Sequence, residues 1–300
     1  MNIVKKPMKW SVCMSLVLLI LTASSLLASG AGGSKVIKVV AAENFYGDIV
    51  KQLGGKQVDV TSILSDPNVD PHEYESNVSD AKAIAGADLV IENSGGYDSW
   101  MDKLLSASPN SKRILLKGFD IATTKLPDNE HIWYDANNIQ AIAQSITGNL
   151  KKLDPAHSAT YTKNLQPFIK GLDQIRHKIT SMKAKFNGTP VGLTETIFLY
   201  QSGPLGLKVL TPFEFQKAVA EGNDPPADTI VTAEKQIKSK AVKVLIYNKQ
   251  TVSKITTKLQ DDAKAVKISI VPVTETMPAD KNYQSWMLGQ LDLLEKALGR

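Results

Sequence analysis

The sequence contains almost no cysteine. Cys13 is the only one among 300 residues, and it precedes an apolar run near the N-terminus. A lipid-modified cysteine would follow such a run, so Cys13 is not at a lipoprotein attachment position. Beyond the run there is no thiol, which excludes disulfides, iron–sulfur clusters and thiolate zinc sites from that part of the chain. Any metal chemistry must therefore use nitrogen and oxygen ligands.

The sequence also has little excess charge. Lys and Arg number 35 against 30 Asp and Glu, and three of the basic residues, Lys5, Lys6 and Lys9, lie before the apolar run. Without these three, 32 basic residues face 30 acidic ones, and no basic stretch is interleaved with aromatic residues, which make up only 6% of the chain. This pattern predicts no nucleic-acid partner. The 43% hydrophobic and 22% charged content is typical of a globular protein.

The N-terminus has the pattern of an export signal. The three lysines precede an apolar run from Met14 to Leu27, and the small residues Ala28–Ala31 follow it. The run is shorter than the ~20 residues that a membrane-spanning helix needs. We therefore expect residues 1–31 to be a signal peptide, with an uncleaved anchor as the alternative. The mature protein should act in the periplasm or at the cell surface.

Short β-rich runs alternate with helical patterns in two parts of the chain, 36–150 and 188–300. Such alternation predicts parallel sheets covered by helices. The expected strands of the two parts are 36–41, 58–64, 88–93 and 113–117, then 190–194, 207–210, 242–248 and 266–273. The expected helices are 45–53, 78–87 and 99–106, then 212–221, 232–240, 250–265 and 283–298.

A long helix is expected between these two parts, over residues 154–187. Asp154 and Pro155 form a typical helix start, and Asn187-Gly188 a typical end. We expect Pro167 to kink or break the helix, and the two histidines in it to lie on a solvated face. Apolar residues recur at spacings of three and four along it, at Tyr161, Leu165, Phe168, Leu172, Ile175, Ile179, Met182 and Phe186. The predicted fold is therefore α/β, with two parallel-sheet lobes joined by one long helix.

Potential metal ligands follow four of the expected strands. In open parallel sheets, ligands bind beyond the carboxyl ends of the strands. His72 and His131 follow strands of the first lobe, and Glu195 and Glu275 follow strands of the second. Two imidazoles and two carboxylates suit a first-row divalent cation. Without thiolates the preference leans to manganese or ferrous iron, with zinc close behind.

Each of these residues also has an ordinary structural explanation. A histidine in a loop is usually a surface or capping residue. Glu195 and Glu275 adjoin threonines at strand ends, where a hydrogen-bonded structural role is common. Asp135 has the position of a helix N-cap. The residue pattern alone therefore leaves the ligand assignment open.

One segment resembles a known family. Residues 70–75, Asp-Pro-His-Glu-Tyr-Glu, are similar to the segment that carries the first ligand in the metal-binding solute receptors of zinc and manganese ABC importers. The resemblance covers nearly all of the chain beyond the signal peptide. It continues through Trp100 after Gly95-Gly96-Tyr97, then His131-Ile132-Trp133, the long helix and Asp224-Pro225-Pro226.

The resemblance implies a metal-ligand set in a cleft between the lobes. His72 and His131 match the two N-lobe histidines of the family. Glu195 matches the third ligand, a position that is histidine or glutamate in different members. Glu275 stands where many members have aspartate, and the nearby Asp280 competes for that role.

The sequence departs from the family pattern at a few places. Asn129-Glu130 replaces the common Asp-Pro before the second histidine, and Ala136 replaces a common proline. The histidine-rich loop of many zinc receptors is absent, which favours manganese over zinc, with iron also possible as the ligand.

The resemblance implies an extracytoplasmic receptor that delivers a divalent metal to an ABC-type membrane permease, acting as a monomer without a catalytic step. It also implies that the long helix limits lobe closure. Two other functions stay open at this stage, a secreted metallohydrolase and a surface adhesion protein. A metallohydrolase would need an open coordination position and a general base, and the sequence has no His-Glu-x-x-His motif.

Overall fold

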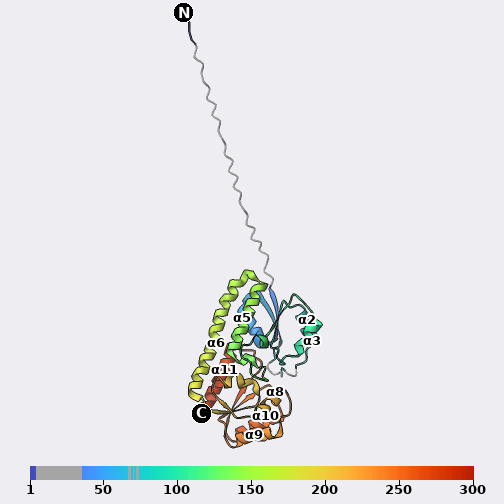
Figure 1. Cartoon of the computed structure of the whole chain (residues 1–300), viewed down its shortest axis with the longest axis vertical. Coiled ribbons are helices and arrows are strands. Elements are labelled where there is room, and N and C mark those ends of the chain that lie inside the picture. The colour runs from blue at the N-terminus through green and yellow to red at the C-terminus, as the bar shows by residue number, and fades with distance from the viewer. Residues whose placement is uncertain (5–35, 67–68, 70, 72–73) are drawn as a thin grey trace. The chain divides into compact units, whose positions relative to one another are not determined.

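Two parallel sheets of four strands, one in each half of the chain, form the framework of the structure (Figure 1). The computed structural model describes residues 1–4 and 36–300, apart from 67–68, 70 and 72–73. Most of the predicted signal peptide and the predicted ligand His72 therefore lie outside the described residues. In the part of the chain that is described, no helix has both the length and the apolar character needed to cross a membrane.

The N-terminal sheet has the strand order β2-β1-β3-β4, and all neighbouring strands are parallel. Its strands are β1 (Ile37–Glu43), β2 (Val58–Leu64), β3 (Leu89–Glu92) and β4 (Ile114–Lys117). Its helices are α1 (Asn44–Gly54), α2 (Val78–Ala85), α3 (Trp100–Ala107), α4 (Gly118–Ile121) and α5 (Ala136–Leu153). As predicted, Asp135 caps α5, since its Oδ1 accepts a 2.7 Å hydrogen bond from the backbone of Asn137.

The C-terminal sheet repeats this topology with the order β6-β5-β7-β8, although no repeat is evident in the sequence. Its strands are β5 (Pro190–Leu193), β6 (Lys208–Val209), β7 (Val244–Asn248) and β8 (Ser269–Val273). Its helices are α7 (Leu199–Ser202), α8 (Phe213–Ala220), α9 (Ala227–Lys238), α10 (Lys254–Ala265) and α11 (Tyr283–Leu298). Every predicted strand is present, and the two central strands of each sheet are mostly buried.

Two helices of the C-terminal lobe begin at other residues than predicted. Helix α9 begins at Ala227, earlier than expected, directly after a proline. Helix α10 begins at Lys254 instead of Gln250, because Ser253 and Thr256 form a reciprocal capping box there. The residues between β7 and α10 are therefore a loop at the carboxyl end of the sheet.

The long helix α6 (Ser158–Phe186) connects the lobes, after a 3₁₀ turn at Pro155–His157. It continues through Pro167, so of the two predicted outcomes the break is wrong, whereas the kink stays a prediction. Packing overrides the local preference of proline, since Phe168, directly after it, and Leu172 are buried in the core. Figure 1 shows α6 running past both lobes, and the helix contacts α1 and α5 of the first and α11 of the second.

The two lobes share one hydrophobic core. The largest apolar cluster contains residues of both sheets together with α1, α5, α6 and α11. Its centre includes Trp133, whose ring stacks on Phe45 with centroids 4.8 Å apart and whose carbonyl accepts a 2.6 Å hydrogen bond from Tyr283. Both lobes belong to a single compact unit. Separating them would expose apolar surface to water, so the fold resists a wide opening.

Two buried carboxyl groups, those of Glu43 and Asp98, lie at the carboxyl end of the N-terminal sheet. Glu43, the last residue of β1, is fully buried, and neither of its carboxyl oxygens has a hydrogen-bond partner among the described residues. Asp98 accepts backbone hydrogen bonds from Asn93 at 2.6 Å and Ser94 at 2.7 Å. Burial, and then the negative charge of Asp98, raise the pKa of Glu43 well above its ordinary value.

This pair predicts a pH-dependent stability that Glu43→Gln removes. A raised pKa contributes stability that is present at low pH and lost as pH rises through the folded-state value. Glutamine has a similar shape and cannot ionise. The free energy of unfolding of Glu43→Gln should therefore increase relative to that of the wild type as pH rises from about 5 to about 9. Urea unfolding across this range measures the difference.

The exposed Glu214→Gln on α8 is the matched control for this experiment, because it makes the same substitution at a surface carboxylate. It should leave the pH profile of the wild type in place. Parallel profiles for the wild type and Glu43→Gln would contradict the raised pKa of Glu43.

Candidate metal centre

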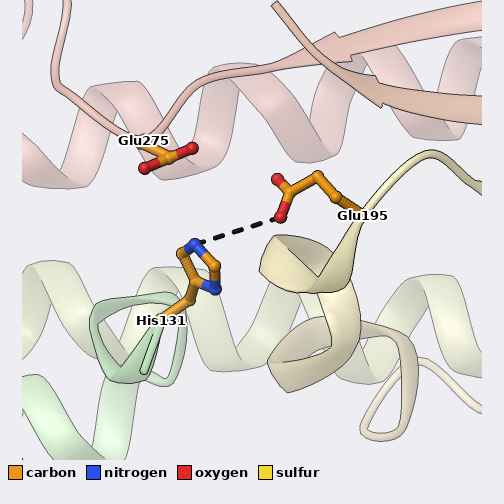
Figure 2. Close-up of side chains that lie close together, drawn as sticks. All are labelled: His131, Glu195 and Glu275. Atoms are coloured by element: carbon orange, nitrogen blue, oxygen red, sulfur yellow. Dashed lines mark ion pairs between the residues drawn. The ribbon is translucent and has the colours of Figure 1, made fainter. Parts of the chain in front are cut away.

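Three of the four predicted ligands come together at one buried point. His131, Glu195 and Glu275 each offer one ligand atom, and these atoms lie within 4.8 Å of one another. All three residues are at most 1% exposed. Figure 2 shows the imidazole of His131 facing the two carboxylates, with Nε2 of His131 4.0 Å from Oε2 of Glu195. The histidine comes from the N-terminal lobe and both glutamates from the C-terminal lobe, so the group lies between the lobes.

Asn129 orients the imidazole of His131. Its Oδ1 accepts a 3.0 Å hydrogen bond from the backbone nitrogen of His131 and lies 3.0 Å from the Nδ1 of the ring. Because Oδ1 is then an acceptor, the proton of the neutral imidazole belongs on Nδ1. The Nδ2 of Asn129 donates to the carbonyl of Thr196 at 2.9 Å, which also ties this loop to the other lobe. The Nε2 lone pair is thereby directed at the carboxylates, as in a typical histidine metal ligand.

Glu195 lies two residues after the end of β5 and caps the 3₁₀ turn Thr196–Phe198. Its Oε2 accepts a 3.1 Å hydrogen bond from the backbone of Ile197, and its buried Oε1 has no hydrogen-bond partner among the described residues. Burial, and then the charge of Glu275, raise the pKa of Glu195 well above its ordinary value. Such a carboxylate is poorly stabilised by the protein alone.

Glu275 follows β8 and is held by residues from both lobes. Its Oε2 accepts a 3.0 Å hydrogen bond from the hydroxyl of Tyr97 in the N-terminal lobe. Its Oε1 accepts hydrogen bonds from Asn248, at the end of β7, and from Thr251. Burial and the charge of Glu275 raise the pKa of Tyr97, so this hydroxyl stays protonated and donates. The carboxylate of Glu275 is thereby fixed in position.

The donor set fits a divalent cation. Two buried carboxylates within reach of each other repel, and burying such charges is unfavourable without a compensating partner. A cation between them would supply that compensation, and the neutral imidazole adds a nitrogen donor. Nitrogen with carboxylate oxygen suits manganese, iron and zinc.

Asp280, the alternative to Glu275, lies outside this group. Its side chain is 76% exposed and pairs with Lys281 at 3.4 Å. His157 is not on a solvated helix face but in the 3₁₀ turn, where its Nδ1 lies 2.7 Å from Asp154. The ring centroid of Trp133 lies 5.1 Å from that of His131. His72 stays a prediction, since it lies outside the described residues.

The sequence analysis missed three residues that support the group, Asn129, Asn248 and Tyr97. A signal for Asn248 was present in the sequence. Asn248 is the last residue of the expected strand 242–248, just as Thr194, the residue before Glu195, is the last residue of the expected strand 190–194. In the sheet order β7 lies between β5 and β8, which brings Asn248 to the strand ends that carry the two glutamates. Tyr97 and Asn129 belong to loops, where no periodicity marks them.

Sequence comparisons identify related proteins. The profile of the ZnuA family, described as zinc-uptake complex component A periplasmic, matches residues 39–297. The metal ABC transporter substrate-binding lipoprotein ScbA of Streptococcus cristatus is 30% identical over 197 residues, which are 59% of this chain and 62% of that protein. More than a third of that relative is therefore unmatched. The manganese ABC transporter substrate-binding lipoprotein PsaA of Streptococcus anginosus is 27% identical over 247 residues, 75% of this chain and 78% of the relative.

Solved structures share the fold. The periplasmic zinc binding protein TroA from Treponema pallidum has a TM-score of 0.74 at 19% identity, covering 89% of this chain and 100% of that one. The laminin binding protein Lmb of Streptococcus agalactiae, described as having adhesin and metal transporting activity, has a TM-score of 0.74 at 24% identity, covering 87% and 99%. Since the family profile spans most of the sequence and these structures have the same architecture, the chain belongs to the ZnuA family of zinc-uptake complex component A periplasmic proteins.

Proposed function

We propose that this chain binds a divalent transition metal outside the cytoplasm and delivers it to an ABC-type permease in the membrane. The observation that carries the proposal is the buried group of His131, Glu195 and Glu275, which converges from both lobes. The family is one of substrate-binding components rather than enzymes, so a catalytic step and the metallohydrolase alternative are not retained.

The proposed ligand set is His131, Glu195 and Glu275 together with His72. The first three are supported by their convergence, and His72 by its position in the Asp-Pro-His segment of the sequence. We propose that the metal is the transported substrate, held between the lobes, and that the receptor works as a monomer. The core that the lobes share supports release through small movements at the site rather than wide opening.

Manganese is the proposed substrate, with zinc and iron as the alternatives. Relatives named for each metal exist, including PsaA for manganese, TroA for zinc and the iron ABC transporter substrate-binding lipoprotein MtsA of Streptococcus pyogenes. Glu195 supports the choice, because a second carboxylate favours a hard ion that accepts more than four ligands.

We further propose that the chain reaches the periplasm or the cell surface through the signal peptide at residues 1–31. Relatives named as lipoproteins or as periplasmic proteins support an extracytoplasmic place of action. Cys13 precedes the apolar run, so attachment through a lipid on that cysteine is not part of the proposal.

Metal binding should stabilise the protein against heat, and the effect should depend on the ligands. A ligand that binds only the folded state adds about 2.7 kcal/mol at a hundredfold excess over its Kd. Manganese added to chelator-treated protein should therefore raise Tm by several degrees. His131→Ala and His72→Ala should each reduce this increase strongly, measured within each variant by differential scanning calorimetry.

The exposed His177→Ala on α6 is the control, because it removes a histidine away from the group. It should keep the increase of the wild type. An undiminished increase in His131→Ala would show that the metal binds elsewhere.

Selectivity should depend on Glu195. Glu195→His replaces a charged oxygen ligand by a neutral nitrogen, which suits tetrahedral zinc. The ratio of manganese to zinc affinity should fall by about tenfold or more, a change of the size seen when metal-site residues are replaced. Glu195→Gln keeps the shape without the charge and should weaken manganese binding in particular. Competition titrations of both metals measure the ratio, and an equal ratio in all three proteins would exclude Glu195 as a ligand.

A further inference from the structure

Gln250 is a buried amide in the loop between β7 and α10, and all of its side-chain hydrogen bonds go to the protein. It is 8% exposed. Its Oε1 accepts hydrogen bonds from the backbone nitrogens of Glu275 at 2.6 Å and Thr276 at 3.1 Å. Its Nε2 donates to the hydroxyl of Thr276 at 2.8 Å and to the carbonyl of Val69 at 2.9 Å.

These partners belong to different lobes. Glu275 and Thr276 follow β8 in the C-terminal lobe, whereas Val69 lies in the N-terminal lobe, in the segment between β2 and α2. The same amide therefore supports the backbone of a proposed ligand and the segment of the opposite lobe that leads, three residues later in the sequence, to His72.

Other residues hold the Glu275 loop from the N-terminal lobe as well. Asn44 on α1 makes a reciprocal pair with Met277, donating to its carbonyl at 2.6 Å and accepting from its nitrogen at 2.9 Å. Tyr97 holds the carboxylate itself. Asn44 and Tyr97 lie on α1 and in the loop before α3, whereas Gln250 reaches the segment after β2. Of these residues, Gln250 is the one that joins the Glu275 backbone to Val69.

We propose that Gln250 is a positioning residue that links Val69 to Glu275 and thereby slows metal release. The inference rests on the proposed function, because it assigns Glu275 to the metal. Through one amide, Gln250 holds the backbone of Glu275 and is itself anchored on the carbonyl of Val69 in the other lobe. Without this anchor the amide is held less firmly and its support of the Glu275 backbone weakens. Loss of the hydrogen bond to Val69 therefore favours release of the ion.

The test compares Gln250→Leu with the wild type in the full chain loaded with manganese. Leucine fills a similar volume and makes none of the hydrogen bonds, leaving the backbone groups of Val69, Glu275 and Thr276 without this partner. Dissociation into excess chelator, followed by stopped flow, should be about tenfold faster or more, as expected for the loss of buried hydrogen bonds. The association rate should stay within about twofold, since such changes act mainly on dissociation.

Gln236→Leu is the matched control. Gln236 is a buried amide of the same lobe, 6% exposed, and it donates a 2.6 Å hydrogen bond to Thr211 within that lobe. This variant should lose stability and keep the dissociation rate of the wild type. Gln250→Asn, a milder change whose amide is too short to span both partners, should accelerate dissociation in the same direction as Gln250→Leu.

Hydrogen exchange of the metal-free proteins is a second measurement. A role of Gln250 confined to the C-terminal lobe would not change the exchange of peptides that contain Val69. Peptides containing Val69 should exchange faster in Gln250→Leu and not in Gln236→Leu. Unchanged exchange at Val69, or an unchanged dissociation rate with normal binding by the wild type, would overturn the role of Gln250. Failure of the wild type to bind manganese, zinc or iron would instead overturn the proposed function, while the exchange data would still test the link.

Discussion

The burial of two carboxylates beside one imidazole is the constraint on which the rest of the structure depends. Glu195 and Glu275 lie out of contact with water and within reach of each other, an arrangement that folding alone disfavours. The surrounding protein compensates only partly, through backbone, hydroxyl and amide donors. Fixed donors keep the ligand atoms together before a cation is bound, so less ordering is needed when it binds.

The two sheets explain how such a group forms. Parallel strands end at a common edge, and β5, β7 and β8 lie side by side at the edge that carries Glu195, Asn248 and Glu275. The N-terminal lobe brings His131 and Tyr97 against this edge. Helix α6 contacts both lobes, and one apolar core extends through both. The residues that each lobe contributes to the group are therefore held in fixed positions relative to one another. This shared core opposes a wide separation of the lobes.

The sequence predicted much of this arrangement. Strand and helix patterns depend on local spacing, so the two α/β lobes, the long helix and the cap at Asp135 were predictable. Strand ends are also local features, which is why His131, Glu195 and Glu275 stood out as candidates. The choice between Glu275 and Asp280 was open, because both follow the same strand and only their burial separates them.

Other features were decided by the tertiary structure alone. The continuous helix through Pro167 depends on packing against both lobes, which outweighs the local preference of proline. The partners of Gln250 are separated by 181 and 25 residues in the sequence, and no local pattern connects positions so far apart. The raised pKa of Glu43 arises because a strand end and the loop that carries Asp98 are buried together. The sequence by itself therefore determined which residues are candidates, and the order of the strands in the sheets and the packing of the lobes determined which of them meet.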